Sequence, residues 1–177
     1  GFGQVGEAAA RHGLEHPTWQ PHHHFETDAS KSFFVLDREA CILCGRCTTA
    51  CAETQHIGAI SLLGRNQDAR VGVVSDGPMS ASICTSCGQC VATCPTGALR
   101  PKEAVVPVVR RVDTICPYCG VGCGITLGVR ADGRLAGMAD DAPANPSSRG
   151  MLCVKGRFGT GFVHARDRIT TPMIKRE

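Results

Sequence analysis

The sequence predicts an α+β fold built from short helices and short strands in small domains. Cysteine accounts for 12 of the 177 residues, whereas the chain has only 6 Phe, 1 Trp and 1 Tyr. So few aromatic side chains indicate a small core, and domains with small cores usually depend on covalent or metal crosslinks. The 21 Gly and 10 Pro residues divide the apolar segments into short pieces.

The first 30 residues are expected to form a short helix and a linker. Residues 4–13 hold an alanine-rich segment that ends at Gly13, which is typical of a helix with a glycine stop. Residues 15–30 are rich in Pro, His and Asp, so we interpret them as a linker. Within it, the run His22–His24 is interpreted as a solvated loop, because consecutive residues of an extended chain point to different sides.

Residues 31–108 are predicted to form a second domain made of two related halves. The elements expected there are a strand at Ser32–Leu36, helices near Thr48–Gln55 and Cys90–Cys94, an irregular insertion at Gly64–Ser80 and a strand-like connector at Pro101–Val112.

Residues 109–177 are predicted to be β-rich. Ile125–Val129 alternates, Asp132-Gly133 makes a turn, and Arg134–Met138 returns, which together predict a β-hairpin. A loop of Pro, Asn and Ser at Ala142–Gly150 then leads to Cys153.

Charge and hydropathy exclude two classes of partner. The 19 Lys and Arg residues nearly balance the 16 Asp and Glu residues, and no basic block is present, so we expect no nucleic-acid partner. No apolar run approaches the roughly 20 residues of a membrane-spanning helix, so we expect no membrane partner.

The cysteines fall into three groups of four. The first two groups share one spacing, and each cysteine of the second lies 43 residues after its counterpart, which indicates an internal duplication. The groups are Cys41-x2-Cys44-x2-Cys47-x3-Cys51, then Cys84-x2-Cys87-x2-Cys90-x3-Cys94-Pro95, and finally Cys116-x2-Cys119-x3-Cys123 with Cys153.

Three chemistries compete for these thiols. Disulfides need well-separated partners and an oxidising compartment. Three cysteines within seven residues are too crowded to pair with one another. Structural zinc usually takes two distant short pairs, so it remains an alternative chiefly for the third group. The spacing of the first two groups is that of the bacterial two-cluster iron–sulfur run, in which the fourth cysteine ligates the other cluster. Iron–sulfur clusters also indicate a reducing compartment, and we expect the cytoplasm.

We therefore predict three 4Fe–4S clusters. Three thiolates at steps of three wrap one cube, and the fourth, one helical turn later, points to the other cube. The ligand sets are Cys41, Cys44, Cys47 and Cys94 for cluster A, Cys84, Cys87, Cys90 and Cys51 for cluster B, and Cys116, Cys119, Cys123 and Cys153 for the third cluster. Ala52 stands where the second motif has Pro95, which is no ligand, so cluster A is retained.

The residues around the motifs fit this prediction. Gly45 and Gly88 have no Cβ and let backbone N–H groups approach sulfur. Arg46 stands where the second motif has Gln89, and a cation there is expected to favour the reduced cluster A. A dry apolar shell is expected from Ile42, Leu43, Ile60, Ile83, Val91 and Leu99.

The third group resembles the 4Fe–4S domain of molybdenum- or tungsten-containing bis-pterin oxidoreductases. The resemblance rests on Cys116-Pro117-Tyr118-Cys119-Gly120-Val121-Gly122-Cys123 and on Cys153-Val154-Lys155-Gly156-Arg157-Phe158. It is closest to formate dehydrogenases. Nearly the whole chain resembles the N-terminal part of the alpha subunit of the NAD-dependent enzymes, where a duplicated ferredoxin-like module precedes this domain.

The resemblance implies cofactors, partners and roles. It implies a molybdenum or tungsten bis-pterin guanine dinucleotide beside the third cluster, with Lys155 and Arg157 as cofactor-binding residues and Lys155 aiding electron passage. It also implies a beta subunit that binds FMN and NAD, and a gamma subunit. The expected function is an electron relay between a formate-oxidising centre and that flavin subunit.

Two departures from the family limit this expectation. The family's upstream 2Fe–2S and His/Cys-ligated clusters have no counterpart before Cys41, and its active-site residues would lie beyond Glu177. We therefore expect a fragment without a formate site of its own, whose partner is the remainder of the alpha subunit. The alternatives are a standalone ferredoxin-like carrier, a fragment of a related NADH-linked oxidoreductase, and a zinc-stapled interaction protein.

Overall fold

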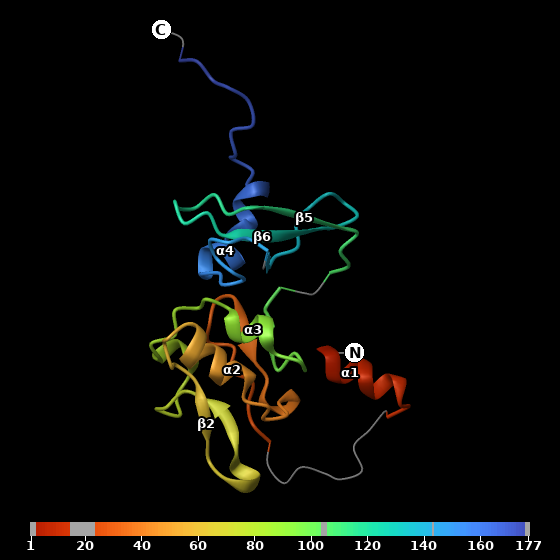
Figure 1. Cartoon of the computed structure of the whole chain (residues 1–177), viewed down its shortest axis with the longest axis vertical. Helices are drawn as coiled ribbons and strands as arrows, with labels where there is room; N and C mark the ends of the chain where they lie inside the picture. Colours follow the sequence, from red (N-terminus) through yellow and green to blue (C-terminus); the bar gives the residue numbers. More distant parts are fainter. Residues whose placement is uncertain (1–2, 15–23, 104–105, 143, 176–177) are drawn as a thin grey trace. The chain divides into compact units, whose positions relative to one another are not determined.

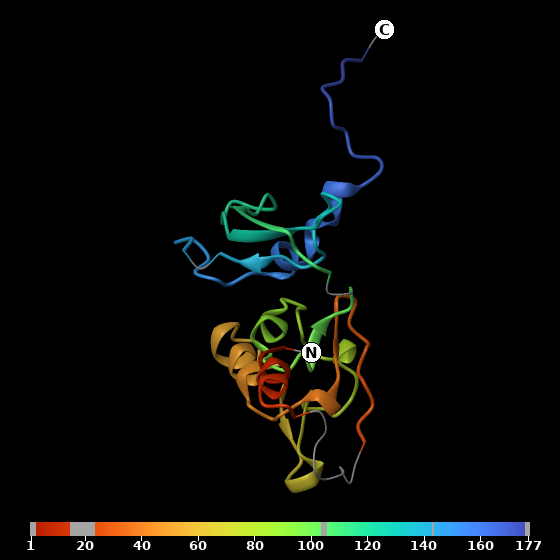
Figure 2. The same cartoon turned by 90° about the vertical axis from the view of Figure 1, so that its right-hand side faces the viewer.

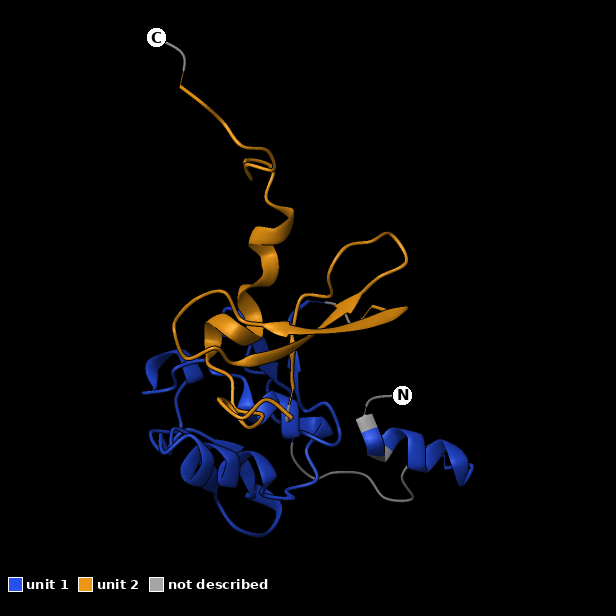
Figure 3. Cartoon of the chain, turned by 45° about the horizontal axis from the view of Figure 1, so that its top comes forward, with its two compact units in different colours: residues 1–105 blue, residues 106–177 orange. Residues whose placement is uncertain are grey.

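The computed structural model describes residues 3–14, 24–103, 106–142 and 144–175 (Figure 1). Short helices and strands alternate along the chain, as two perpendicular views show (Figure 1, Figure 2), and the fold is mixed α and β. The chain divides into two compact units, Gly1–Val105 and Val106–Glu177 (Figure 3). Most of the linker predicted at residues 15–30 lies outside the described residues.

The first unit repeats one backbone pattern at both of its cysteine motifs. In the first motif Leu43 has φ 55° and Gly45 has φ 74°, and in the second Ser86 has φ 58° and Gly88 has φ 75°. Each glycine immediately precedes a helix, α2 (Arg46–Thr49) or α3 (Gln89–Thr93). Left-handed backbone turns the chain sharply, and glycine adopts it without steric cost. The duplication in the sequence is therefore also a duplication of backbone geometry.

The two repeats end differently. After α2 the chain continues as the π-helical turn η2 (Ala50–Thr54), which contains Cys51. After α3 it leaves the helix at Cys94, whose backbone is extended at φ −73° and ψ 117°. Pro95 explains the difference, because a residue before proline is driven out of the helical region. Ala52 at the matching position allows the helix to go on, so the predicted helices are confirmed with unequal lengths.

Two small antiparallel sheets complete the first unit. The strand β1 (Phe34–Leu36) pairs with β4 (Leu99–Pro101), and β2 (Ser61–Leu63) pairs with β3 (Arg70–Gly72). The N-terminal helix α1 (Gly3–Arg11) ends before Gly13, as predicted. The buried side chains include Phe34, Leu36, Ile60, Val71, Val73, Met79 and Leu99.

The segment Gly64–Ser80, which we expected to be irregular, holds part of a hairpin. It contains the turn η3 (Asn66–Asp68), then β3, and then the turn η4 (Met79–Ala81). The hairpin is drawn in yellow below α2 (Figure 1). The guanidinium of Arg38 donates to the Val71 carbonyl at 3.0 Å and ties β3 to the chain before the first motif. A strand of three residues is too short for alternation to appear in the sequence.

The second unit is a three-stranded sheet with helical turns after it. The strands β5 (Arg110–Ile115), β6 (Gly124–Val129) and β7 (Asp140–Asp141) lie in the order β5-β6-β7. The helix α4 (Val154–Phe158) and the turn η5 (Gly159–His164) follow. Among the described residues, no helix has the length and apolar character needed to cross a membrane.

The hairpin predicted for this unit is only partly correct. The main partner of β6 is the upstream strand β5, paired from Arg110↔Val129 to Ile115↔Gly124. The predicted return segment Arg134–Met138 forms one isolated bridge, between Val129 and Leu135. Two backbone hydrogen bonds flank it, from the Ala136 N–H to the Gly128 carbonyl and from the Arg130 N–H to the Arg134 carbonyl. β5 is largely exposed, so its sequence carries no alternation that would identify it as the partner.

Candidate metal centres

The first candidate centre is a hollow in the first unit. Four cysteines line it, and they are the four of the predicted cluster A: Cys41, Cys44, Cys47 and Cys94. Leu36, Val71, Ala98 and Leu99 line it as well and give it apolar walls. The fourth cysteine, Cys94, belongs to the second motif, whereas the other three belong to the first. It lies 43 residues after Cys51, the cysteine at the same position of the first motif.

The second candidate centre is a hollow in the same unit. Its cysteines are the four of the predicted cluster B: Cys51, Cys84, Cys87 and Cys90. Phe34, Ile57, Ile60 and Met79 provide apolar lining. The helices α2 and α3 lie against each other (Figure 1). Cys51, which follows α2, lines the second hollow, and Cys94, which follows α3, lines the first.

The third candidate centre lies in the second unit, where β5 turns into β6. The N–H of Cys116 donates to the Cys123 carbonyl at 2.8 Å and closes the loop between the strands. Burial raises the pKa of the Cys123 thiol, and the nearby Cys116, Cys119 and Cys153 raise it further. Cys153 stands immediately before α4, so the structure brings the four thiols of the third predicted set together from a loop and a helix start.

The thiols are costly to ionise where they stand. Burial, together with the neighbouring Cys41, Cys94 and Cys44, raises the pKa of Cys47 to about 11. Burial likewise raises the pKa of Cys90 strongly, and its cysteine neighbours add to the effect. Four thiolates crowded in a low dielectric require a compensating positive charge, which bound metal supplies.

The chemistry of these donor sets fits iron–sulfur clusters. Thiolate-only sets suit zinc or iron–sulfur clusters. Within the part of the chain that the structure describes, no three His, Cys, Asp or Glu side chains converge closely enough to hold a single ion. In the first unit the cysteines instead line the two hollows described above.

Backbone N–H groups point at the sulfur atoms. Those of Leu43 and Ser86 donate to the first cysteine of each motif, Cys41 and Cys84, both at 3.4 Å. The left-handed backbone at both donors produces this contact twice. Hydrogen bonds to sulfur stabilise thiolate and are one of the factors that set a cluster's reduction potential.

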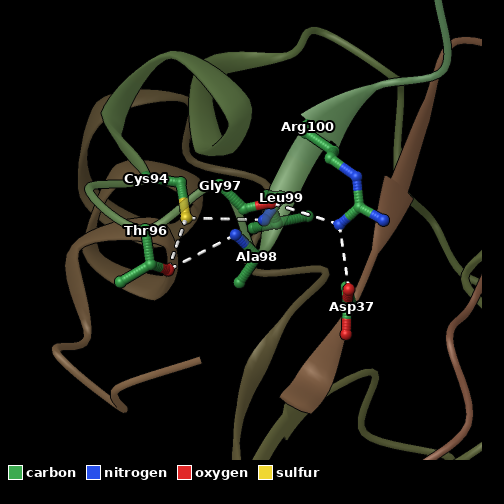
Figure 4. A network of polar contacts seen from close by, with 7 residues as sticks. All are labelled: Asp37, Cys94, Thr96, Gly97, Ala98, Leu99 and Arg100. Carbon is green, nitrogen blue, oxygen red and sulfur yellow. Dashed lines mark hydrogen bonds and ion pairs between the residues drawn. The ribbon is translucent and has the colours of Figure 1, made fainter. Parts of the chain in front are cut away.

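The fourth cysteine of each motif also accepts a backbone N–H. Ala59 donates to Cys51 at 3.3 Å, and Leu99 donates to Cys94 at 3.4 Å (Figure 4). Burial acts to raise the pKa of Cys94, but hydrogen bonds from Leu99 and Thr96 outweigh it, and the pKa is lowered. Thr96 is a site residue that the sequence analysis missed.

The predicted apolar shell is correct in part. Ile60, Val91 and Leu99 are buried, whereas the following residues are exposed: Ile42 at 54%, Leu43 at 38% and Ile83 at 72%. Although exposed on one side, Ile42 lines the first hollow. The exposed three lie in or beside the cysteine loops, which run along the surface because most of their backbone groups are not paired in a sheet or helix. Arg46 is exposed as well.

Lys31 is a second residue that sequence reasoning missed. Its ammonium donates to the Cys84 carbonyl at 2.8 Å, across 53 positions of the chain. Nearby, the Ser80 N–H donates to the hydroxyl of Ser30 at 3.0 Å, so the segment before β1 lies against the second cysteine loop. No local motif signals such a contact, because it depends on how two distant segments pack.

The lysine implicated by the resemblance lies against the third cysteine loop. The ammonium of Lys155 stands 5.9 Å from the centroid of the Tyr118 ring. The Tyr118 hydroxyl donates to the Gly159 carbonyl at 2.5 Å, and its ring meets Phe162 edge-to-face. Arg157 is fully buried within the second unit, and its backbone N–H donates to the Cys153 carbonyl at 3.1 Å. The contact between Tyr118 and Lys155 is one that the motif alone did not reveal.

Two family models match the chain, one in each unit. Residues 40–98 match the 4Fe-4S dicluster domain, and residues 109–165 match the molybdopterin oxidoreductase Fe4S4 domain. The two matched segments contain all twelve cysteines.

Curated proteins with similar sequences are oxidoreductases. The chain is 37% identical over 152 residues to a subunit of an NADH-quinone oxidoreductase of Rhizobium meliloti, covering 81% of this chain and 17% of the relative. It is 33% identical over 143 residues to the alpha subunit of an NADPH-Fe(3+) oxidoreductase of Geobacter sulfurreducens, covering 78% and 16%. It is 27% identical over 188 residues to "Putative formate dehydrogenase SH0748" of Staphylococcus haemolyticus, covering 82% and 19%. The chain therefore spans about a fifth of the length of these relatives.

A solved structure shares the fold over part of the chain. A crystal structure of an NAD+-reducing [NiFe]-hydrogenase superposes with a TM-score of 0.53 and 26% identity, covering 60% of this chain and 47% of that one.

Proposed function

Since the chain carries the iron–sulfur domains of the molybdopterin oxidoreductase family, we propose that it relays electrons through three 4Fe–4S clusters. The observation that carries the proposal is the gathering of the cysteines into sets of four, two of them around separate hollows. The proposed ligands are Cys41, Cys44, Cys47 and Cys94 for cluster A, Cys84, Cys87, Cys90 and Cys51 for cluster B, and Cys116, Cys119, Cys123 and Cys153 for the third cluster.

The residues of the chain bind and tune these groups. When bound, each cluster supplies one-electron redox chemistry. The cysteines hold it as thiolates, and the amides of Leu43, Ser86, Ala59 and Leu99 donate to their sulfur atoms. Phe34, Ile60 and Leu99 exclude water from the inner walls of the two hollows.

The finer proposal is that the chain belongs to a formate dehydrogenase alpha subunit. It is supported by the sequence Lys155-Gly156-Arg157 two residues after Cys153, and by a relative that carries the formate dehydrogenase name. In that setting a molybdenum or tungsten bis-pterin lies beyond the third cluster, and a flavin- and NAD-binding partner subunit takes the electrons. Lys155, held at the Tyr118 ring, is the proposed electron-transfer residue toward the pterin.

A second candidate is an NADH-linked oxidoreductase that does not use formate. It is favoured by the higher identity to the NADH-quinone oxidoreductase relative, 37% against 27% for the formate-named relative. Both candidates use the same three clusters, and the donor that reduces them is formate in the first and NADH in the second.

Two measurements test these proposals. Anaerobically purified protein should contain about twelve irons and twelve sulfides, since three cubane clusters hold four of each, and its reduced form should give iron–sulfur EPR signals. Stoichiometric zinc in place of iron contradicts the relay. In the assembled complex, formate without NADH should reduce the clusters. Reduction by NADH but not by formate would favour the second candidate.

A further inference from the structure

Thr96 places a buried hydroxyl beside the sulfur of Cys94 (Figure 4). The Oγ1 atom lies 3.7 Å from Cys94 Sγ, and the residue is 7% exposed. Nearly all buried hydroxyls in proteins are hydrogen-bonded. The two partners of the Thr96 hydroxyl therefore indicate which atom donates in each bond.

The bonds of Thr96 decide which atom donates. The Ala98 N–H donates to Thr96 Oγ1 at 3.3 Å and so occupies one of its lone pairs. A hydroxyl offers one proton besides its two lone pairs, and that proton remains for Cys94. A cysteine that binds iron does so as a thiolate, which can only accept. Once Cys94 is a ligand, Thr96 is therefore the donor and the sulfur the acceptor.

The turn that carries Thr96 is held in place by the strand β4, which follows it, and by Asp37. Leu99 is in β4, where it pairs with Leu36, and its N–H donates to the same sulfur at 3.4 Å. Arg100 donates to the Gly97 carbonyl at 3.4 Å and pairs with the Asp37 carboxylate at 3.1 Å. Figure 4 shows the contacts of Leu99 and Arg100 with Cys94, Gly97 and Asp37. The hydroxyl is thus preorganised at the sulfur, as a tuning group must be.

The duplicated motif does not repeat this contact. Two residues after Cys51 stands Glu53, which is exposed. Cys51 lies in the π-helical turn, and its sulfur accepts the Ala59 N–H at 3.3 Å. In both repeats a backbone amide donates to the fourth cysteine. The side-chain hydroxyl contact is described for Cys94, through Thr96, and has no equivalent at position 53.

We propose that Thr96 is a positioning residue that donates a hydrogen bond to the metal-bound sulfur of Cys94 and raises the reduction potential of cluster A. The inference rests on the proposed function, because it requires a cluster at Cys41, Cys44, Cys47 and Cys94. A donor at sulfur stabilises the reduced cluster, which carries one more negative charge, more than the oxidised one. Cluster A is thereby a better electron acceptor than its thiolates and amides alone would make it.

The test is an EPR-monitored redox titration of the full chain and its variants. In Thr96→Val the reduced-to-oxidised ratio of cluster A at a fixed potential should fall about threefold, a downward shift of roughly 28 mV, since tenfold is about 59 mV for one electron. The reduction potential of cluster B should not change. Thr96→Ser keeps the hydroxyl and should keep the potential, and Thr54→Val is the matched control elsewhere in the unit.

The outcomes separate the inference from the function on which it rests. Unchanged potentials in a Thr96→Val protein with all its iron overturn the tuning role and leave the relay intact. Protein without iron–sulfur clusters overturns both. If Thr96→Val does not load cluster A, Thr96→Ala supplies the same measurement without the added methyl. If neither loads while Thr96→Ser does, the hydroxyl is needed to build the loop, and the tuning role is wrong.

Discussion

Single side chains distinguish the two cysteine hollows of the first unit. Arg46 lies within the first motif and is exposed, whereas Lys31 reaches the second motif from outside and is half-buried. A cation near a cluster favours its reduced form, and water screens an exposed cation more strongly than a half-buried one. The two clusters should thus respond unequally to the removal of their cations.

Lys31→Gln should lower the potential of cluster B more than Arg46→Gln lowers that of cluster A. We expect a fall of about tenfold in the reduced-to-oxidised ratio for Lys31→Gln and of about threefold for Arg46→Gln. Redox titration of both variants measures this. Lys31→Arg keeps the charge and serves as the control. Equal shifts, or a shift of the other cluster, would contradict the assignment.

Lys155 should affect the rate of electron transfer without affecting cluster content. Lys155→Gln removes the cation at the Tyr118 ring. Under the proposed formate dehydrogenase function, this change should slow formate oxidation by the complete enzyme at least tenfold, a loss of about 1.4 kcal/mol of transition-state stabilisation. Steady-state kinetics and iron analysis are measured on the same sample. Lys175→Gln, at the distant end of the described chain, is the matched control, and wild-type turnover in Lys155→Gln would refute the role.

Gly159 is required because Tyr118 lies directly against it. A Cβ built on Gly159 would stand 2.6 Å from the Tyr118 hydroxyl oxygen, whereas at Gly161 nothing lies within 4 Å. Gly159→Ala should therefore destabilise the second unit by about 1–3 kcal/mol, the usual cost of overpacking. Thermal unfolding of the loaded protein measures it, with Gly161→Ala as the control. Equal melting temperatures would show that Tyr118 moves aside freely.

At the scale of elements, the fourth cysteine is placed by how its helix ends. Cys94 leaves α3 in an extended conformation before Pro95, and Cys51 stays within the turn η2. The carbonyl of Cys51 accepts the N–H groups of Ile57 at 2.9 Å and Gly58 at 3.1 Å. These bonds fold the chain back after the turn, so the conformation at Cys51 and the path to Ala59 depend on each other.

Ala52→Pro should disrupt the site at Cys51 although proline is the residue of the other motif. Proline inside a helical turn removes a backbone hydrogen bond and clashes with the preceding turn, at a cost of about 3 kcal/mol or more. We expect the loss of about four of the twelve irons, those of cluster B. Iron analysis and EPR measure it. Ala52→Glu, at the same exposed position, should retain all iron. A fully loaded Ala52→Pro would show that the fourth cysteine can bind its cluster from an extended chain end as well as from a helical turn.

At the scale of the whole molecule, bound metal must provide much of the stability. The buried hydrophobic residues described in the second unit form a small cluster of Cys116, Ile125, Ala139 and Leu152, in which one member is itself a cysteine of the third set. The first unit likewise buries Cys47 and Cys90 among its core side chains. Small metal-binding domains draw much of their folding free energy from the metal.

Protein stripped of iron should lose its cooperative thermal transition. The reason is that the cysteines form part of the core. Without metal, nothing holds together the four cysteines of each hollow or those of the third loop. Circular dichroism melts of loaded and stripped protein measure it, with cluster reconstitution as the control for reversibility. A native-like cooperative melt of the iron-free protein would contradict the expectation.

The sequence by itself determined the local features of this protein. The steps of three and four between cysteines, Gly45 and Gly88 before the helices, and Pro95 after Cys94 each act through near neighbours, so they can be read directly. The grouping of the cysteines into sets of four follows from the same spacing, and the structure gathers the thiols of these sets in both units.

Only the tertiary structure decided the contacts between distant segments. The pairing of β6 with β5, the reach of Lys31 to Cys84 and the burial of Arg157 carry no local signal. Even the local Thr96 contact becomes specific only because β4, paired with β1, holds the turn against the sulfur. The physical reason is that such contacts depend on which surfaces pack together, and packing is settled by the whole unit rather than by any short segment.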